Sequence, residues 1–302
     1  MDSGEQPKSS RQADGPLFFM HIPKTAGTSI YHLLARHFRA EDVHPIPLPG
    51  PVDGGIGGLP TCAFEGLHAA QVAFDPVRAS SFRLVLGHYD GGIWERMPSL
   101  VTFTFLREPA ARVISAYRHA ARSKDSWSRD LHDLIAGGVT IRGMFDNPDV
   151  VAEVRRSQGE QIAGYRWSQP PQSIDDEPLL ALALERLDRM VLVCLTERFE
   201  ASLLLLMNHL RKAMTDDVPR QNVAPEESLS GDVDETLLRD IRSVCWVDCR
   251  LYQAGVERFE RDWRQLMIDL FGERDPAVAP GSDCDPHVLD RARQRLNRMY
   301  GS

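Results

Sequence analysis

Short apolar runs alternate along the chain with stretches in which apolar residues recur every three or four positions. Four runs are short enough to be strands, at residues 17–22, 83–86, 100–106 and 190–195. Helix-type spacing follows three of them, at about residues 30–38, 109–122 and 197–210. Strands that alternate with helices favour a mostly parallel sheet covered on both faces. The pattern therefore predicts a three-layer α/β fold, with a central sheet flanked by helices.

The beginning of the chain and one internal segment lack this alternation. Residues 1–15 are polar and contain no apolar core of signal-peptide length, so they are predicted to form a disordered leader. Residues 44–60 are dense in Pro and Gly and are predicted to form a long irregular loop.

Two helical regions complete the predicted domain. Residues 123–180 contain mainly helical or irregular pieces, which predict insertions beside the sheet. A long helical stretch at about residues 233–271 and a terminal helix at 285–299 form a C-terminal helical region. Because neither an internal repeat nor a linker is recognisable, residues 16–302 are predicted to form one domain.

The charge balance narrows the classes of ligand. The chain has 43 acidic and 35 basic residues and a formal net charge of -8. General nucleic-acid binding needs clustered Lys and Arg, so the sequence argues against it. A local basic pocket for a small anion remains compatible with this balance.

Apolar runs and cysteines indicate the compartment. The longest apolar run, residues 201–207, is far shorter than the roughly 20 residues of a membrane span. The five cysteines are scattered and odd in number, which favours reduced thiols and a cytoplasmic protein. Cys245 and Cys249 lie four apart on a predicted helix and are interpreted as packing residues, so no metal site is expected.

The strongest chemical motif lies between the first strand and its helix. It comprises Lys24, Thr25, Ala26, Gly27, Thr28 and Ser29. A helix N-terminus at the carboxyl end of a parallel strand favours phosphate or sulfate, and the lysine and hydroxyls add charge and donors. A helix capped by Thr or Ser is the simpler explanation, but it accounts for only one hydroxyl. The nucleotide-triphosphate loop GxxxxGK[ST] does not fit, because Lys24 precedes the glycine.

Two further strand ends carry candidate residues. Arg107 follows the third strand, and Ser115 lies about two turns along the next helix. A guanidinium and a hydroxyl in this arrangement can bind a second phosphate, although a surface arginine is the usual alternative. His88 follows the second strand, so its ring is expected at the same sheet edge, where it can serve as a general base.

These motifs together resemble a known family. FMHIPKTAGTS at residues 19–29, GHY at 87–89 and FLREPAARVISAY at 105–117 are similar to sulfotransferases that use 3′-phosphoadenosine 5′-phosphosulfate (PAPS). The closer likeness is to the carbohydrate branch that includes heparan sulfate 2-O-sulfotransferase and bacterial relatives. It runs from about residue 17 to about 265, with softer matches at EQIAG (160–164), LTERF (195–199), NVAP (222–225) and the late helix that contains Asp248.

The resemblance implies a P-loop-like fold and a role for each matching residue. Residues 24–29 would form the 5′-phosphosulfate loop, in which Lys24 stabilises the leaving phosphate. Arg107 and Ser115 would hold the 3′-phosphate, and the loop that contains Asn222 would close over the nucleotide. His88 would take the proton from the acceptor hydroxyl. PAPS would be the co-substrate, and the chemistry would need no metal.

The acceptor is less defined. No basic run for a long polyanion is recognisable, so a hydroxyl of a neutral carbohydrate, a glycolipid or a small metabolite is expected. Trp94, Tyr165 and Trp167 are candidates for sugar stacking, with core packing as the better default. The sequence does not indicate the oligomeric state.

Two other functions remain open from the sequence. One is a nucleotide or small-molecule kinase on a P-loop-like fold, although no Mg²⁺-binding acidic strand end is evident. The other is a non-catalytic module that binds a nucleotide. The presence of both Lys24 and His88 argues against it, because binding alone needs no base.

Overall fold

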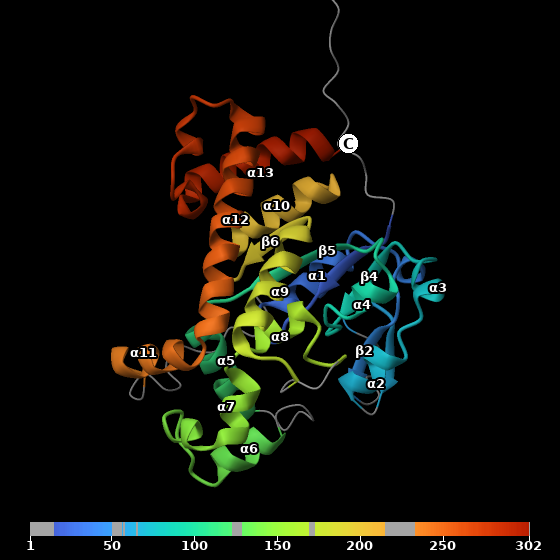
Figure 1. The fold of residues 1–302 in the computed structure, drawn as a ribbon. Helices are drawn as coiled ribbons and strands as arrows, with labels where there is room; N and C mark the ends of the chain where they lie inside the picture. Colours follow the sequence, from blue (N-terminus) through green and yellow to red (C-terminus); the bar gives the residue numbers. More distant parts are fainter. Residues whose placement is uncertain are drawn as a thin grey trace, which may run out of the picture.

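The fold is seen in a computed structural model of the chain (Figure 1). The structure describes residues 15–49, 56, 58–64, 66–122, 129–168, 173–214 and 233–301. The predicted leader, apart from Gly15, and the predicted loop around Asn222 lie outside these residues.

A four-stranded sheet forms the centre of the protein. Its strands are β1 (Leu17–Met20), β4 (Leu84–Gly87), β5 (Val101–Leu106) and β6 (Leu192–Leu195). They are all parallel and lie in the order β4-β1-β5-β6. Every residue of these strands is buried, because helices and connecting segments cover both faces of the sheet. The predicted α/β fold, with a parallel sheet flanked by helices, is confirmed.

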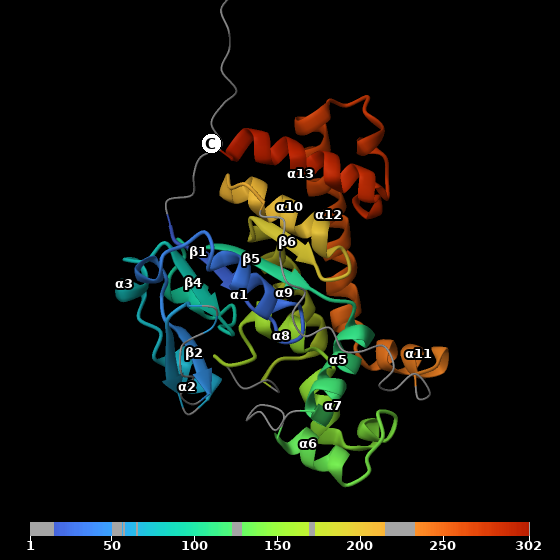
Figure 2. The same cartoon turned by 180° about the vertical axis from the view of Figure 1, so that it is seen from behind.

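Helices make up most of the remaining described chain (Figures 1 and 2). They are α1 (Gly27–Leu34), α2 (Leu67–Val72), α3 (Pro76–Ala79), α4 (Ile93–Arg96), α5 (Pro109–Arg122), α6 (Arg129–Ala136), α7 (Pro148–Val154), α8 (Ser157–Ala163), α9 (Asp176–Arg189), α10 (Phe199–Leu210), α11 (Glu235–Val244), α12 (Trp246–Phe271) and α13 (Pro286–Tyr300). Short 3-10 turns lie at Ala40–Asp42, Gly143–Asp146, Pro276–Val278 and Ser282–Cys284.

Two sequence predictions are corrected. The predicted loop at residues 44–60 contains β2 (Ile46–Pro49), which pairs in parallel with β3 (Thr61–Phe64) in a separate two-stranded sheet. Its two prolines are tolerated because a two-stranded sheet consists only of edge strands. The predicted helix at 233–271 is two helices, because the backbone leaves the helical region at Cys245 (φ -93°, ψ 30°).

The buried side chains form two clusters. The larger surrounds the central sheet and extends to α9, α10, α12 and α13. The smaller joins α5, α7 and α11 with residues 139–146. Figures 1 and 2 show α6, α7 and α11 at the end of the molecule away from α13, with α12 running between the two ends. The predicted insertion at residues 123–180 is thus mostly helical in its described part and contributes to a separate core.

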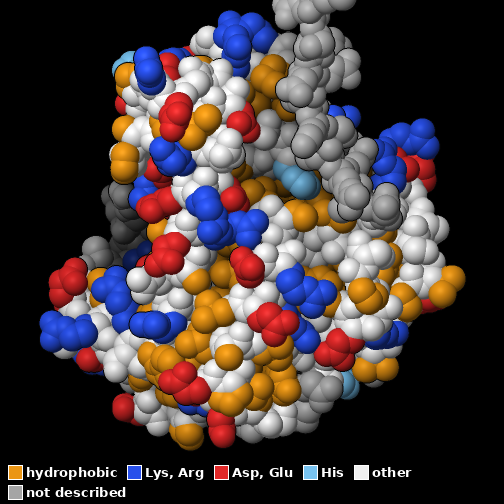
Figure 3. Space-filling model, turned by 45° about the horizontal axis from the view of Figure 1, so that its top comes forward, with side chains coloured by type: hydrophobic (Ala, Val, Ile, Leu, Met, Phe, Trp, Pro, Cys, Tyr) orange, Lys and Arg blue, Asp and Glu red, His pale blue; other side chains and the backbone are white. Residues whose placement is uncertain are grey.

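The described helices and one face of the molecule bear on the sequence's expectations of hydrophobicity and charge. Among the described helices, none combines the length and the apolar character that a membrane span needs. On the face drawn in Figure 3, acidic and basic side chains are interspersed, and none of its coloured area forms an extended surface of one charge.

Candidate functional site

The strand ends meet as the parallel sheet requires. β1 lies between β4 and β5, and Met20 is in register with both Gly87 and Thr104. The segments that follow these three strands therefore emerge at one sheet edge. There, Nη1 of Arg107 donates to the Lys24 carbonyl at 3.0 Å, and Nδ1 of His88 bonds to the His21 carbonyl at 2.8 Å. Three residues predicted for the site, Lys24, His88 and Arg107, are thus linked through the backbone of one loop.

The loop after β1 has an unusual backbone. Lys24 (φ 70°) and Ala26 (φ 71°) are left-handed, whereas Thr25 between them is not. Each left-handed non-glycine residue costs about 1–2 kcal/mol, so the surrounding structure must stabilise the loop. Successive residues of opposite backbone hand can turn their N–H groups toward one side and bind an anion, so this loop is a candidate anion site.

Helix α1 begins directly after this loop. Its N-cap is Ala26, and no acidic residue lies in its first turn. The explanation of the motif as a Thr or Ser cap is therefore wrong, because alanine has no side-chain oxygen to accept from the first-turn N–H groups. Thr25 instead donates its hydroxyl to the Ile22 carbonyl at 2.8 Å. Its side chain stabilises the loop, while Thr28 is half-buried and Ser29 is buried in the first turn.

Gly27 is required by packing. A Cβ atom at this position would lie 1.8 Å from Nε2 of His21, well inside van der Waals contact. A glycine at this position also lets an anion approach the backbone closely. The structure adds that the imidazole of His21 occupies the space where a side chain would be.

Replacement of Gly27 by alanine is expected to displace the His21 ring and lower the free energy of unfolding by about 1–3 kcal/mol. Gly66→Ala is a matched control, because a Cβ there would meet no atom within 4 Å. Urea denaturation of the two variants measures the difference. Equal stabilities would contradict the packing role of Gly27.

His88 is held as a neutral imidazole. Because a carbonyl only accepts, the bond to the His21 carbonyl places the proton on Nδ1 and leaves the lone pair on Nε2. Burial lowers the pKa of His88 to about 4, although the hydrogen bond to His21 opposes this shift. At neutral pH the ring is therefore a base ready to take a proton at Nε2.

Arg107 lies half-buried at the end of β5. Its Nε is buried and has no hydrogen-bond partner in the structure. Burial lowers the pKa of Arg107, the positive charges of Arg112 and Arg118 lower it further, and Glu197 opposes the change. A guanidinium with a buried, unpartnered N–H beside other arginines is suited to an anion, which would supply the missing acceptor.

Two other predicted residues have less geometric support. Ser115 is half-buried on α5, eight positions after Arg107. Asn222 lies outside the described residues.

Helix α8 contributes residues to which sequence reasoning gave no role. Gln158 makes two hydrogen bonds to the backbone of Arg107: its Oε1 accepts from the Arg107 N–H at 3.1 Å, and its Nε2 donates to the Arg107 carbonyl at 2.9 Å. Gln161 donates from Nε2 to the carbonyls of His21 and Tyr89, at 2.9 and 3.2 Å. Helix α8 is thus hydrogen-bonded to the segments that follow β1, β4 and β5. The sequence feature that could have indicated this role is a pair of glutamines three positions apart, which share a helix face.

Asp248 on α12 fixes this helix. Its two carboxylate oxygens accept from the N–H groups of Gln158 and Gly159, at 3.1 and 2.9 Å, in the first turn of α8. A carboxylate at a helix N-terminus satisfies unpaired donors and the helix dipole. The soft resemblance around Asp248 therefore coincides with a residue that holds α8 against the strand ends.

The ionisation of Asp248 predicts a pH effect on stability. Burial raises its pKa from 3.8 to about 6, although Arg112 and the two N–H groups oppose the change. The folded protein then binds more protons than the unfolded chain between pH 4 and 6, so the contribution of Asp248 to stability falls as pH rises through this window. The unfolding free energy of the wild type, minus that of Asp248→Asn, should decrease by up to about 3 kcal/mol between pH 4 and 6.5. Urea denaturation at several pH values measures it, and a constant difference would contradict the raised pKa.

The aromatic candidates for sugar stacking divide into two groups. Trp94 is buried, and its Nε1 donates to Oγ1 of Thr102 at 2.7 Å, so it is a core residue. Tyr165 and Trp167 are half-buried, and the Trp167 N–H donates to Asp90 at 2.6 Å. Asp90 comes two residues after His88, so the segment containing Trp167 is anchored to the chain that carries the candidate base.

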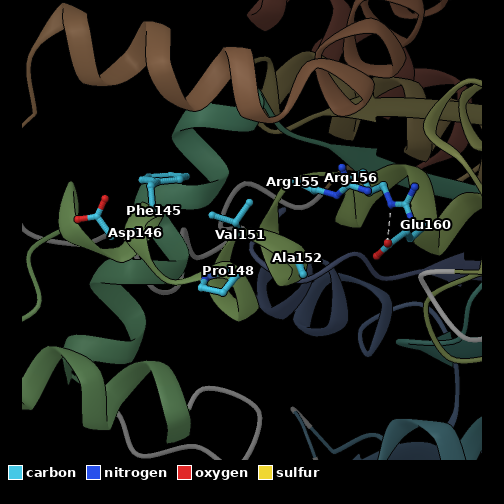
Figure 4. A pocket seen from close by; sticks show the side chains of 8 residues that line it. All are labelled: Phe145, Asp146, Pro148, Val151, Ala152, Arg155, Arg156 and Glu160. Atoms are coloured by element: carbon cyan, nitrogen blue, oxygen red, sulfur yellow. Dashed lines mark hydrogen bonds and ion pairs between the residues drawn. The ribbon is translucent and has the colours of Figure 1, made fainter.

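A hollow of about 450 Å³ lies in the helical insertion (Figure 4). It is lined by Phe145, Asp146, Pro148, Val151, Ala152, Arg155, Arg156 and Glu160. The buried Arg156 and Glu160 pair with each other at 2.9 Å, and Arg156 also pairs with Asp176. None of the strand-end residues lines this hollow.

The described residues contain no group of three or more His, Cys, Asp or Glu side chains that could hold a metal ion. No model of a known protein family matches the chain, and no curated protein matches it significantly. The function is therefore inferred from the residues and their geometry.

Proposed function

We propose that this protein is a PAPS-dependent O-sulfotransferase. The observation that carries the proposal is the linked set at one sheet edge: an imidazole held neutral, a lysine loop leading into a helix N-terminus, and an arginine with an unpartnered N–H. The two places suited to anions match a donor with a 5′-phosphosulfate and a 3′-phosphate. The base matches an acceptor hydroxyl that must lose its proton. A central β1 followed by this loop also supports a P-loop-like fold.

The donor would supply an activated sulfuryl group. His88 would accept the acceptor's proton at Nε2 while the acceptor oxygen forms its bond to sulfur. Lys24 and the N–H groups of the loop would stabilise the negative charge that develops as the bond from sulfur to the bridging oxygen breaks. Residues 24–29, including Thr25 through its backbone, would position the 5′ group for in-line transfer.

The second anion position would bind the 3′-phosphate. Nε of Arg107 is a donor without an acceptor, and Nη1 of the same guanidinium supports the Lys24 carbonyl. One residue would thus couple recognition of the 3′-phosphate to the shape of the phosphosulfate loop. Ser115 would add a hydroxyl, and Asn222 would belong to a segment that covers the nucleotide.

The acceptor is proposed to be a hydroxyl on a neutral carbohydrate, a glycolipid or a small metabolite. The acidic balance of the chain supports an acceptor without high negative charge. Trp167, anchored to Asp90 beside the base, is the aromatic residue best placed to contact it.

Calorimetric titration with adenosine 3′,5′-bisphosphate tests the nucleotide class. The bisphosphate should bind without Mg²⁺, and more tightly than ATP with Mg²⁺. Tight binding of ATP with Mg²⁺ alone would favour a kinase and overturn the proposal. Labelled PAPS with a panel of hydroxyl acceptors then separates an enzyme from a nucleotide-binding module, since only the enzyme transfers the label.

A further inference from the structure

Four rings form a continuous stack that ends on the candidate base. Phe103 of β5 stacks on Phe19 of β1, with ring centroids 4.9 Å apart and planes 14° apart. Phe19 stacks on His21 at 5.6 Å and 15°, and His21 stacks on His88 at 4.2 Å and 28°. The first three residues come from the two central strands and their ends, so the stack runs from the sheet core to the site.

The His21 ring has a fixed place in this stack. It is only 8% exposed, and its Nδ1 bonds to the Tyr31 hydroxyl of α1 at 2.9 Å. On one edge it fills the space that a side chain at Gly27 would need. Strand β1, helix α1 and the adjacent rings therefore all restrain its orientation.

The backbone of His21 restrains His88 as well. Its carbonyl receives two hydrogen bonds, one from Nδ1 of His88 and one from Nε2 of Gln161. A single hydrogen bond leaves a ring free to rotate about it. The stacked face of His21 removes that freedom, because it sets the plane in which the His88 ring lies.

We propose that His21 is a positioning residue for His88: its stacked imidazole fixes the plane of the base and keeps water from that face of the ring. The residue would contact no substrate, and it would act only through His88. The catalytic part of this inference rests on the proposed function, whereas the structural part concerns the His88 ring itself.

Several titratable groups surround the two rings. Burial lowers the pKa of His21 well below its usual value, and the charges of His88 and Lys24 add to this effect. Burial raises the pKa of Tyr31 and of Tyr89, so both phenols stay neutral. Both carboxylate oxygens of Asp90 accept hydrogen bonds from the segment of Trp167 and Ser168. Because His21 is neutral, the main influence on the pKa of His88 is the exclusion of water.

Two substitutions separate the ring of His21 from its polar atom. His21→Asn removes the stacked ring but keeps an atom able to bond to the Tyr31 hydroxyl. His21→Phe keeps a stacked ring, and combination with Tyr31→Phe avoids leaving that buried hydroxyl without a partner. NMR titration of ¹³C-labelled histidine in the full chain measures the pKa of His88, whose signal is assigned by its loss in a His88→Gln variant.

The expected result differs between the variants. In His21→Asn, water reaches the exposed face of His88, and its pKa should rise by about one unit or more. In the His21→Phe, Tyr31→Phe double variant, it should stay within a few tenths of the wild-type value. The acid limb of the pH profile for sulfuryl transfer should move with the pKa, which a merely structural loss of folded protein would not cause.

An unchanged His88 pKa in His21→Asn would overturn the inference, and so would equal shifts in the Asn and Phe variants. If the Asn variant does not fold, a double Phe variant with a wild-type pKa supports the role of the stacked ring, and a shifted pKa opposes it. Failure of the proposed function has a different signature, namely neither nucleotide binding nor transfer by the wild type. The NMR titration still decides the positioning of His88 in that case.

Discussion

Replacement of His88 by alanine is expected to lower sulfuryl-transfer turnover by about 10²–10⁴-fold, which is the usual contribution of a general base. The neutral Nε2 is lost, while the loop after β1 and the Arg107 guanidinium remain in place. The affinity for adenosine 3′,5′-bisphosphate should therefore stay near the wild-type value. Turnover with labelled PAPS and calorimetric titration measure the two effects.

His209→Ala is a suitable control for this variant, because His209 is an exposed histidine on α10, outside the candidate site. It should leave both turnover and nucleotide affinity unchanged. Wild-type turnover in His88→Ala would remove His88 as the base. A loss of nucleotide affinity as large as the loss of turnover would instead make it a binding residue.

The pH profile of the wild type provides an independent check on His88. Since burial lowers its pKa to about 4, the base is neutral at every pH above about 5. Transfer should not lose activity between pH 7 and 5.5, where an ordinary histidine with a pKa near 6.5 would become protonated. The same shift means that the unfolded chain binds more protons between pH 4 and 6.5, so the contribution of His88 to stability declines as pH falls through that window.

Replacement of Arg107 by alanine is expected to weaken binding of adenosine 3′,5′-bisphosphate by about 10–150-fold, since a hydrogen bond to a charged group contributes about 1.5–3 kcal/mol. Nε and its neighbouring N–H groups would no longer meet the 3′-phosphate. The affinity of the variant for adenosine 5′-phosphate should fall less, because this nucleotide loses only the indirect effect of the hydrogen bond from Arg107 to the Lys24 carbonyl. Calorimetric titration of both nucleotides gives the comparison.

Arg107→Lys is the matched control, because it keeps the positive charge but loses the planar fork. It should recover part of the affinity for the bisphosphate. The affinity that it does not recover measures the contribution of the directed hydrogen bonds. Equal losses for the two nucleotides in Arg107→Ala would mean that Arg107 acts on the loop alone and does not read the 3′-phosphate.

The sequence located the sheet and the three candidate strand ends because their signals are local. The four strands are apolar runs of the right length, and in a parallel sheet their carboxyl ends must share an edge. Lys24, His88 and Arg107 could therefore be expected at one edge without knowledge of any contact. The same local signals missed β2, because Ile46 and Leu48 alternate with prolines, which usually indicate a loop.

Long-range contacts account for what the sequence did not reveal. The pairing of Asp248 with the N-terminus of α8 joins residues about 90 positions apart, and Gln161 meets the His21 carbonyl across 140 positions. Periodicity places a residue on a face of its own helix, but it does not say which distant backbone group that face will meet. The supporting role of α8 therefore emerges only from packing.

The chain's local pattern was enough to predict a parallel α/β sheet. It also predicted that the loop of residues 24–29, His88 and Arg107 lie at one edge of that sheet. The tautomer and low pKa of His88, the reason for Gly27, and the link between Arg107 and Lys24 depend on atoms from different strands and helices within hydrogen-bonding or van der Waals distance. Residue type and order fix which groups are available. Burial and mutual distance, which arise when the elements pack, set the charge state and orientation of those groups.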